Sequence, residues 1–219
     1  MMILYGYWRS TAAYRVRIGL NVKQLDYESR PVHLVRDGGQ QHTPEYRALN
    51  PQGLVPLLID GNTRISQSSA ILEYLDEKYP GVDLLPGEPE ARAAVRSLYQ
   101  SIACDLHPLN NLRVLQYLER VLNVDKDSRD TWYHHWIHKG FTALENELAA
   151  YAGKGDFCMG ESLSMVDLFL VPQLYNARRF EVPLDEYPRL TAIEQHCLSL
   201  PAFADARPEA QPDAVPKKD

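Results

Sequence analysis

Hydrophobic and polar positions follow two different periods in the first eighty residues, which indicates a mixture of strands and helices. Short apolar runs and weak alternation predict strands, whereas apolar residues recur every three or four positions after Ser10-Thr11 and again from Gln67. The predicted order is strand, helix, strand, irregular segment, strand, turn, strand and helix, at residues 3–5, 12–23, 27–34, 35–53, 54–59, 60–62, 63–65 and 67–79.

The pattern changes after Pro80-Gly81 and Pro86-Gly87, which we interpret as a boundary between two domains. Beyond it, apolar residues keep the helical spacing without comparable strand alternation, so a helical bundle is predicted. The tail 207–219 is rich in proline and charge, and we expect it to be flexible. The predicted helices of the second half span 88–123, 128–150, 164–180 and 188–199.

Composition and charge narrow the range of partners. The chain has 219 residues, of which 45% are hydrophobic and 24% charged, as is typical of a globular protein. Its 23 Lys and Arg against 29 Asp and Glu give a net charge of −6, so we expect neither nucleic acid nor a membrane surface as a partner. An anionic ligand would therefore need local positive charge.

The cysteines and the N-terminus indicate where the protein is found. Cys104, Cys158 and Cys197 are scattered and have no metal-ligand spacing, which favours a reducing cytoplasm and predicts no metal centre. No leader pattern and no apolar run of membrane-spanning length occurs, so we expect a soluble cytoplasmic protein.

Hydroxyl residues stand between a strand and a helix at Ser10-Thr11. Such residues usually cap the helix, because their oxygen accepts from a free N–H of the first turn. A hydroxyl at the positive end of a helix can also stabilise a thiolate. No cysteine lies in this turn, so that thiol would have to come from a ligand.

Two further segments of the first domain could bind a peptide-like ligand. Pro56 begins an apolar strand, and a cis bond before it would turn the backbone of Val55 outward to pair with an extended peptide. Gln67 and Ser68 open a helix, where caps are usual and where free N–H groups can also hold a carboxylate. The sequence leaves both alternatives open.

Three other groups of residues can be interpreted from their positions in the sequence. Ser164 and Asp167 have the spacing of a capping box, which indicates a folding signal and not a site. The histidines at 134, 135 and 138 lack accompanying carboxylates or cysteines, so we interpret them as a partly exposed helix face. Most arginines are solvated, but Arg9 adjoins the hydroxyl turn and could clamp a carboxylate.

Taken together, these features resemble the zeta class of soluble glutathione transferases. The resemblance spans nearly the whole chain. It is carried by the segments YWRSTAAYRVRIGL (5–20), DGGQQ (37–41), ALNPQGLVPLL (48–58), SQSSAILEYLDEKYP (66–80), DLHPLNNLRVL (105–115) and MVDLFLVPQLYNARRF (165–180).

The resemblance implies an α/β thioredoxin-like, glutathione-binding domain at 1–80, an all-α substrate-binding domain at 88–206, and a homodimer. It also implies residue roles. Ser10 matches the family's catalytic serine, with Thr11 beside it as a second candidate. Arg9 and Arg179 match arginines that hold substrate carboxylates. The implied contacts with glutathione are Gln41, Val55, Pro56 with its cis bond, Gln67, Ser68, His107 and Asn111.

The implied activity is a glutathione-dependent cis–trans isomerisation of maleylacetoacetate to fumarylacetoacetate in tyrosine and phenylalanine catabolism. Glutathione transferase activity is implied as a secondary activity. Ala12 replaces a cysteine that is usual in the family, so the implied mechanism relies on Ser10 and not on a protein thiol. Two alternatives remain: isomerisation of maleylpyruvate in gentisate breakdown, and a non-catalytic glutathione-binding module.

Overall fold

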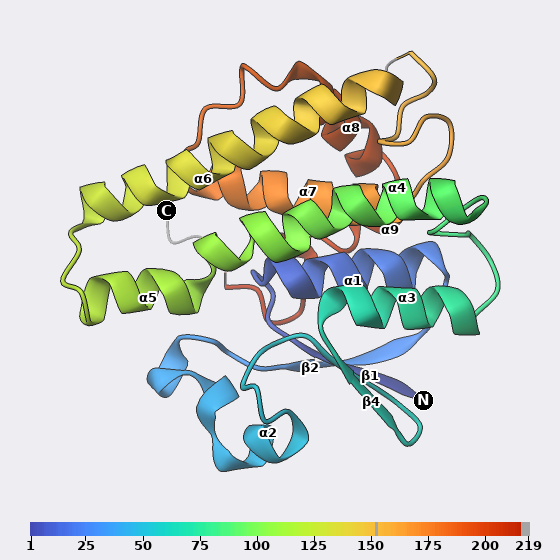
Figure 1. Cartoon of the computed structure of the whole chain (residues 1–219). Coiled ribbons are helices and arrows are strands. Elements are labelled where there is room, and N and C mark those ends of the chain that lie inside the picture. The colour runs from blue at the N-terminus through green and yellow to red at the C-terminus, as the bar shows by residue number, and fades with distance from the viewer. Residues whose placement is uncertain (152, 216–219) are drawn as a thin grey trace. The chain divides into compact units, whose positions relative to one another are not determined.

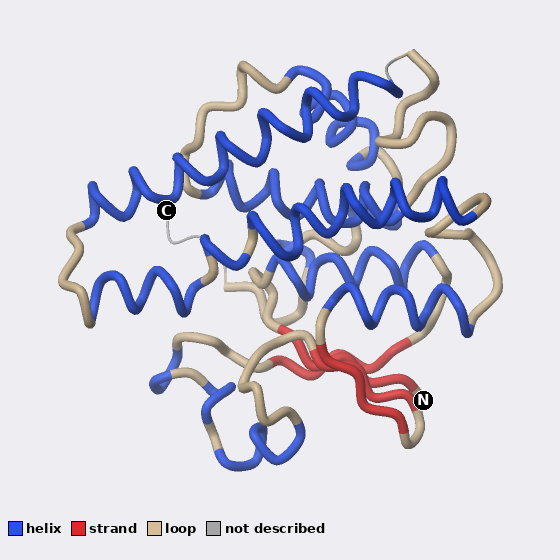
Figure 2. Tube along the Cα trace, viewed as in Figure 1, coloured by secondary structure: helices blue, strands red, loops and turns tan. Residues whose placement is uncertain are grey.

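The computed structural model describes residues 1–151 and 153–215. The chain forms two compact units, one of Met1–Asp83 with Leu198–Asp219 and one of Leu84–Cys197. Figures 1 and 2 show that the first unit contains the strands and the second is helical. The first unit is thus a mixed α/β domain and the second an all-α domain, as the sequence predicts.

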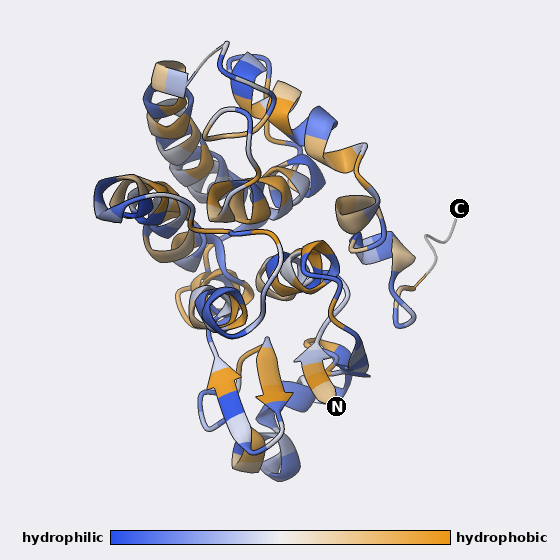
Figure 3. Ribbon diagram, turned by 90° about the vertical axis from the view of Figure 1, so that its right-hand side faces the viewer, coloured by the Kyte–Doolittle hydropathy of each residue, from blue (hydrophilic) through white to orange (hydrophobic). Residues whose placement is uncertain are grey.

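A four-stranded sheet forms the centre of the first unit. The strand order is β2-β1-β3-β4, with β1 parallel to β2 and the other neighbours antiparallel. Leu4 and Leu58 face each other across β1 and β3, and at most 2% of either residue is exposed. Figure 3 shows that some strands are largely hydrophobic whereas another carries hydrophilic residues. The strands are β1 (Met2–Gly6), β2 (Tyr27–Pro31), β3 (Leu57–Asp60) and β4 (Thr63–Ser66).

Helices α1 (Thr11–Val22) and α3 (Ser68–Lys78) pack together on one face of this sheet, as Figure 1 shows. Their apolar positions are fully buried, including Ile18, Leu20 and Leu72. This burial is the main hydrophobic contribution that a helix makes to stability. The pairing brings the N-termini of both helices to the same end of the unit.

The segment between β2 and β3 contains more structure than the irregular stretch that the sequence predicts. Two short 3₁₀ turns, Arg36–Gly38 and Gln40–His42, precede helix α2 (Pro44–Leu49). Thr43 caps α2 by accepting from the N–H of Tyr46 at 3.3 Å, and Pro44 occupies its first position. Strand β2 ends at Pro31, three residues before the predicted end at 34, where its partner β1 also ends at Gly6.

The C-terminal segment of the first unit lies against α1. It contains α9 (Pro201–Ala204) and a 3₁₀ turn at Pro208–Ala210. Arg17 Nε donates to the carbonyl of Ala206 at 3.0 Å, and the Asp213 carboxylate accepts from the N–H of Trp8 at 3.0 Å. These contacts tie residues up to 213 of the predicted tail 207–219 to the first unit, and residues 216–219 lie outside the described part of the chain.

The second unit is the helical bundle. Its main helices are α4 (Pro89–Gln100), α5 (Leu112–Arg120), α6 (Lys126–Glu147), α7 (Met165–Arg179) and α8 (Pro188–Leu198). The prediction of one helix over 88–123 is wrong, because a π-helical turn at Ser101–Leu106 and a 3₁₀ turn at Pro108–Asn110 separate α4 from α5. Pro108 lacks the N–H that a continuous helix needs.

Helix α7 is the core of this unit. Residues 165–170 and Leu174 are fully buried, and α7 packs against α4. Its start confirms the predicted capping box, since the Asp167 carboxylate accepts from the N–H of Ser164 at 2.8 Å. The same carboxylate accepts from the N–H of Cys158 at 2.8 Å, which anchors the preceding loop. Ser164 and Asp167 are therefore structural residues, as predicted.

Candidate active site

The turn from β1 to α1 places Ser10 at the N-cap of α1. Ser10 has an extended backbone (φ −69°, ψ 117°), and its Oγ accepts from the N–H of Ala13 at 3.2 Å. Accepting this bond leaves the hydroxyl hydrogen to donate away from the helix. Thr11 is the first helical residue and is 93% buried, since only 7% of it is exposed. Of the two hydroxyls, Ser10 is therefore the one placed to meet a ligand.

Arg9 precedes this cap and is held by aromatic residues. Its guanidinium carbon lies 4.5 Å from the centroid of the Trp8 ring, and its Nη2 donates to the Tyr7 hydroxyl at 3.5 Å. A cation beside a helix N-terminus adds to the positive potential that the helix dipole creates there. The turn can therefore stabilise an anion.

The loop before β3 contains the one cis peptide bond found among the described residues, between Val55 and Pro56. This confirms the isomer that the resemblance implied. The preceding carbonyl, of Leu54, accepts from the Tyr46 hydroxyl at 2.7 Å and from Asn50 Nδ2 at 2.8 Å. Two donors on one carbonyl fix the loop that presents Val55.

Gln41 lies in the 3₁₀ turn before α2 and is 7% exposed. Its Nε2 donates to the carbonyl of Leu34 at 3.2 Å, while its Oε1 is buried without a hydrogen-bond partner in the described part of the chain. Gly39 has φ +100° and packs so closely that a Cβ there would lie 2.5 Å from Gln41 Nε2. The orientation of the Gln41 side chain thus requires glycine at position 39.

Gln67 and Ser68 stand at the start of α3. Gln67 has φ +72°, a conformation that costs a non-glycine residue about 1–3 kcal/mol and is concentrated at functional sites. Its Nε2 donates to Gln52 Oε1 at 3.0 Å, which connects this turn to the loop before Val55. Ser68 is 6% exposed, and its Oγ accepts from Nη1 of the buried Arg15 at 3.3 Å.

The first unit therefore brings together most of the predicted site residues. Arg9, Ser10 and Thr11 share one turn, and Arg15 joins α1 to the start of α3 at Ser68. Gln67 contacts the loop that carries Val55 and Pro56, and the backbone of Gln41 approaches Gly53 of that loop. Sequence reasoning missed Arg15 as a site residue, because its partner lies 53 positions away.

The three remaining predicted residues belong to the second unit. His107 is the last residue before the 3₁₀ turn, and Asn111 caps α5 through a bond from the N–H of Arg113 at 3.1 Å. Arg179 is at the end of α7, where its Nη1 donates to Asn176 Oδ1 at 3.3 Å. His107 and Asn111 are therefore close in the chain to each other and remote in it from Arg179.

The histidine face of α6 has structural partners. His134 Nε2 lies 2.8 Å from the carbonyl of Phe180, and His138 Nδ1 lies 2.7 Å from the Tyr187 hydroxyl, whereas His135 is exposed. Among the described residues, no three His, Cys, Asp or Glu side chains are grouped so as to hold a metal ion.

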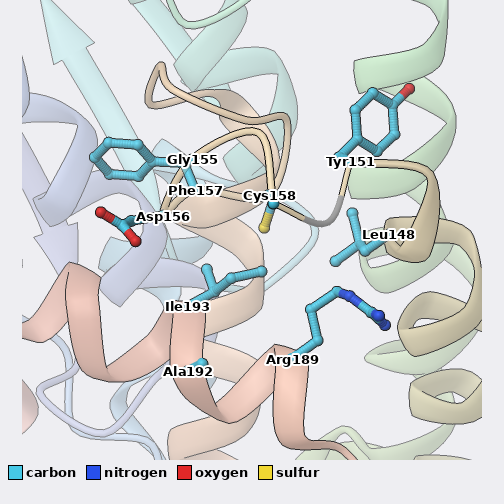
Figure 4. A pocket seen from close by; sticks show the side chains of 10 residues that line it. Leu148, Tyr151, Gly155, Asp156, Phe157, Cys158, Arg189, Ala192 and Ile193 are labelled. Carbon is cyan, nitrogen blue, oxygen red and sulfur yellow. The ribbon is translucent and has the colours of Figure 1, made fainter.

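A pocket of about 170 Å³ in the second unit lies between α8 and the segment that follows α6 (Figure 4). Cys158 lines it, but burial raises the pKa of this thiol well above its usual value, so the thiol stays protonated. Burial also raises the pKa of Cys197. Arg189, at the pocket wall, is bound to Glu145, whose carboxylate also accepts from the N–H groups that begin α8. The pocket is thus unsuited to thiol chemistry.

Family models match both units of the chain. The family model for the N-terminal domain of glutathione S-transferases matches residues 4–83, and the model for their C-terminal domain matches residues 130–194. None of the helices that the structure describes is long and apolar enough to span a bilayer.

Individual relatives match over nearly their whole length. A probable maleylacetoacetate isomerase of Vibrio cholerae is 55% identical over 97% of this chain and 98% of its own. A holo structure of a bacterial zeta-class maleylpyruvate isomerase has a TM-score of 0.94 at 41% identity, covering 97% of this chain and 100% of that one. A maleylacetoacetate isomerase of Methylobacterium extorquens, solved with malonate and glutathione, has a TM-score of 0.92 at 42% identity and covers 98% and 100%.

Proposed function

Because this chain belongs to the zeta class of the glutathione S-transferase family, we propose that it isomerises maleylacetoacetate to fumarylacetoacetate with glutathione as cofactor. The reaction is a step in the catabolism of tyrosine and phenylalanine. The observation that carries the proposal is the Ser10 hydroxyl at the positive end of α1, in a turn without a protein thiol.

The residues of the first unit fit glutathione. Gln41 has a buried oxygen without a partner among the described residues, and a buried acceptor of this kind is suited to a ligand N–H. The backbone of Val55 precedes a cis-proline and can pair with an extended peptide, and the N-terminus of α3 with Ser68 can hold a carboxylate. Gln67 adds a side-chain amide to the same place, and the likeness to the family also assigns glutathione contacts to His107 and Asn111.

When bound, glutathione would supply the thiolate for a reversible addition that lets the cis double bond rotate as a single bond. Ser10 Oγ–H donates to the sulfur and keeps it ionised, with the first-turn N–H groups of α1 and the charge of Arg9 adding to the favourable potential. Thr11 supports this turn from its buried first helical position.

The substrate is a dicarboxylate, and the proposed partners of its carboxylates are Arg9 and Arg179. Arginine binds a carboxylate through two parallel N–H bonds, which fixes orientation as well as charge. Charge that develops on the diketo group in the transition state is stabilised by the same local positive potential. A chain of net charge −6 needs these arginines to attract a dianion.

Maleylpyruvate is the second candidate substrate, because a zeta-class maleylpyruvate isomerase has the TM-score of 0.94. The deciding experiment follows the ultraviolet change when purified protein is added to maleylacetoacetate or maleylpyruvate, each with and without glutathione. Turnover of maleylacetoacetate that requires glutathione is the expected result. Faster turnover of maleylpyruvate would instead assign the protein to gentisate breakdown. Retention on immobilised glutathione without turnover of either substrate would indicate a binding module.

We also propose that the protein acts in the cytoplasm as a homodimer. Three large apolar side chains lie in α5 or just after it, and more than half of each is exposed in the single chain: Tyr117, Val121 and Leu122. Exposed apolar side chains that are grouped in this way commonly mark an interface. Sedimentation equilibrium of the purified protein should give twice the chain mass of 25.0 kDa, and a value of one chain mass would contradict the proposal.

A further inference from the structure

The two arginines proposed to hold the substrate each lie over the aromatic ring of an adjacent residue. The guanidinium carbon of Arg179 is 4.8 Å from the ring centroid of Phe180, and that of Arg9 is 4.5 Å from the ring centroid of Trp8. Both distances are within the range of roughly 6 Å in which a cation is attracted to an aromatic face. The Arg9–Trp8 pair lies in the first unit and the Arg179–Phe180 pair lies in the second, so each unit contains this arrangement by itself.

Each ring is held by a second aromatic side chain. Phe180 stacks on Tyr133 with centroids 3.9 Å apart and an interplanar angle of 16°, and Tyr133 is 0% exposed. Trp8 meets Tyr7 edge to face, with centroids 6.0 Å apart, and only 7% of Trp8 is exposed. Rings that are held against a second ring in these two ways offer a fixed surface for the arginines.

A polar neighbour fixes the rotation of each guanidinium. Asn176 Oδ1 accepts from Arg179 Nη1 at 3.3 Å, and the Tyr7 hydroxyl accepts from Arg9 Nη2 at 3.5 Å. The charge of Arg179 also reaches Tyr133, where burial raises the pKa and the arginine opposes that shift. The aromatic ring against one face and the hydrogen bond at one nitrogen fix the orientation of each guanidinium. They thereby fix the direction from which a carboxylate can form two parallel bonds with it.

We propose that Phe180 and Trp8 are positioning residues that hold the guanidinium groups of Arg179 and Arg9, each within its own unit, in an orientation suited to binding a carboxylate. The inference rests on the proposed function, because it takes these arginines as the substrate contacts. Arginine loses much side-chain entropy when it is ordered, so a pre-ordered guanidinium binds a carboxylate more tightly.

Phe180 is the better position for a test, because Trp8 is nearly buried next to Ser10. Phe180→Leu removes the ring and Phe180→Tyr keeps it. We expect Phe180→Leu to raise KM for the dicarboxylate about three- to tenfold, with kcat and the KM for glutathione near their original values. Phe180→Tyr should retain the original KM, because the ring under Arg179 remains.

A double-mutant cycle separates this effect from general packing. In an Arg179→Met background, Phe180→Leu should raise the KM for the dicarboxylate no further, since the guanidinium that the ring supports is absent. Tyr151→Leu is the matched control, because it removes the ring 5.6 Å from Lys154 Nζ in the same unit. Residues 133 to 147 of α6 separate the two places by about 21 Å, so this control should leave both KM values unchanged.

Binding of malonate in the presence of glutathione, measured by calorimetry, gives a readout that does not depend on turnover. A weaker affinity for malonate in Phe180→Leu, with glutathione affinity unchanged, is expected even if the natural substrate differs from the one proposed. Equal loss for malonate and glutathione, or the same loss in the Arg179→Met background, would overturn the positioning role. If Phe180→Leu does not fold, Phe180→Met, which is also without a ring, takes its place in the same cycle.

Discussion

At the scale of single residues, the observed capping role of Ser10 and its proposed catalytic role can be separated. Its Oγ accepts a cap bond from Ala13, and its hydrogen is available for a thiolate. Ser10→Ala should lower kcat by about 10²-fold, the effect of losing one donor to a developing anion. Loss of the cap should lower the free energy of unfolding by only about 0.5–2 kcal/mol. Steady-state kinetics and urea unfolding measure the two effects.

The pH–rate profile makes this prediction more specific. Without the Ser10 donor, the pKa of bound glutathione should rise towards about 8.5, the value of a free thiol, so the acidic limb of the profile moves to higher pH. Asp125→Ala is the matched control, since it removes the cap of α6 in the second unit, where Asp125 accepts from the N–H of Ser128 at 2.7 Å. Unchanged turnover in Ser10→Ala would assign activation of the thiol to another group.

Asp60 accepts hydrogen bonds from three side chains of the first unit. One carboxylate oxygen accepts from Lys78 Nζ at 2.8 Å, Tyr79 Oη at 2.6 Å and Tyr74 Oη at 2.7 Å, and these bonds lower the pKa of Asp60 to about 2. A lowered folded-state pKa stabilises the fold above the unfolded value of 3.8, and this contribution is lost as pH falls from about 4 to about 2.

We therefore expect Asp60→Asn to lower the free energy of unfolding by about 1–2 kcal/mol at pH 7 and by much less near pH 2. Urea unfolding at a series of pH values measures the difference. Glu28→Gln is the control, because Glu28 pairs with Arg30 at the surface, where ion pairs contribute little. A difference between Asp60→Asn and the original protein that does not change with pH would show that the carboxylate charge is not the cause.

At the scale of elements, the loop before α2 depends on glycine in two different ways. Gly38 and Gly39 both have positive φ, but a Cβ at Gly38 would meet nothing within 4 Å, whereas a Cβ at Gly39 would lie 2.5 Å from Gln41 Nε2. Gly39→Ala should therefore displace Gln41 and raise the KM for glutathione, while Gly38→Ala carries only the cost of the backbone conformation.

We expect both alanine variants to lose about 1 kcal/mol of stability, and only Gly39→Ala to weaken glutathione binding, by roughly three- to tenfold. Calorimetric titration with glutathione and thermal unfolding give the two quantities. Equal affinities in the two variants would mean that Gln41 does not contact glutathione.

The same elements show what the sequence could and could not predict. The capping box at Ser164 and Asp167 was predictable because both partners lie within one helical turn. The short helix α2 and the break between α4 and α5 were missed, since six residues give too little periodicity and apolar spacing continues across the π-helical turn. Local patterns therefore predicted where long helices begin better than where they are interrupted.

At the scale of the whole molecule, the candidate site depends on contacts between residues far apart in the sequence. Ser68 meets Arg15 from 53 positions away, and the ring of Phe180 meets that of Tyr133 from another helix. Neither pair follows from periodicity or from a motif, because each depends on how helices pack. The resemblance predicts which residues meet ligands, whereas the neighbours that hold those residues in place were found only in the structure.

Ligand binding should connect this site to the stability of the chain. Most of the proposed glutathione contacts lie in the first unit, so a ligand that binds only the folded unit stabilises it by mass action. At 100 times its dissociation constant, glutathione should add about 2.7 kcal/mol, which for a chain of this size corresponds to a rise in Tm of about 5–10 °C. Differential scanning calorimetry with increasing glutathione measures this rise.

Two variants test whether the rise in Tm with glutathione comes from the proposed contacts. Ser68→Ala should reduce the increase in Tm, because Ser68 is at the N-terminus of α3 where we place a carboxylate of glutathione. Arg179→Met should leave the increase intact, since Arg179 is assigned to the substrate and not to glutathione. An undiminished increase in Ser68→Ala would remove Ser68 from the glutathione site, and loss of the increase in Arg179→Met would move that arginine from substrate binding to cofactor binding.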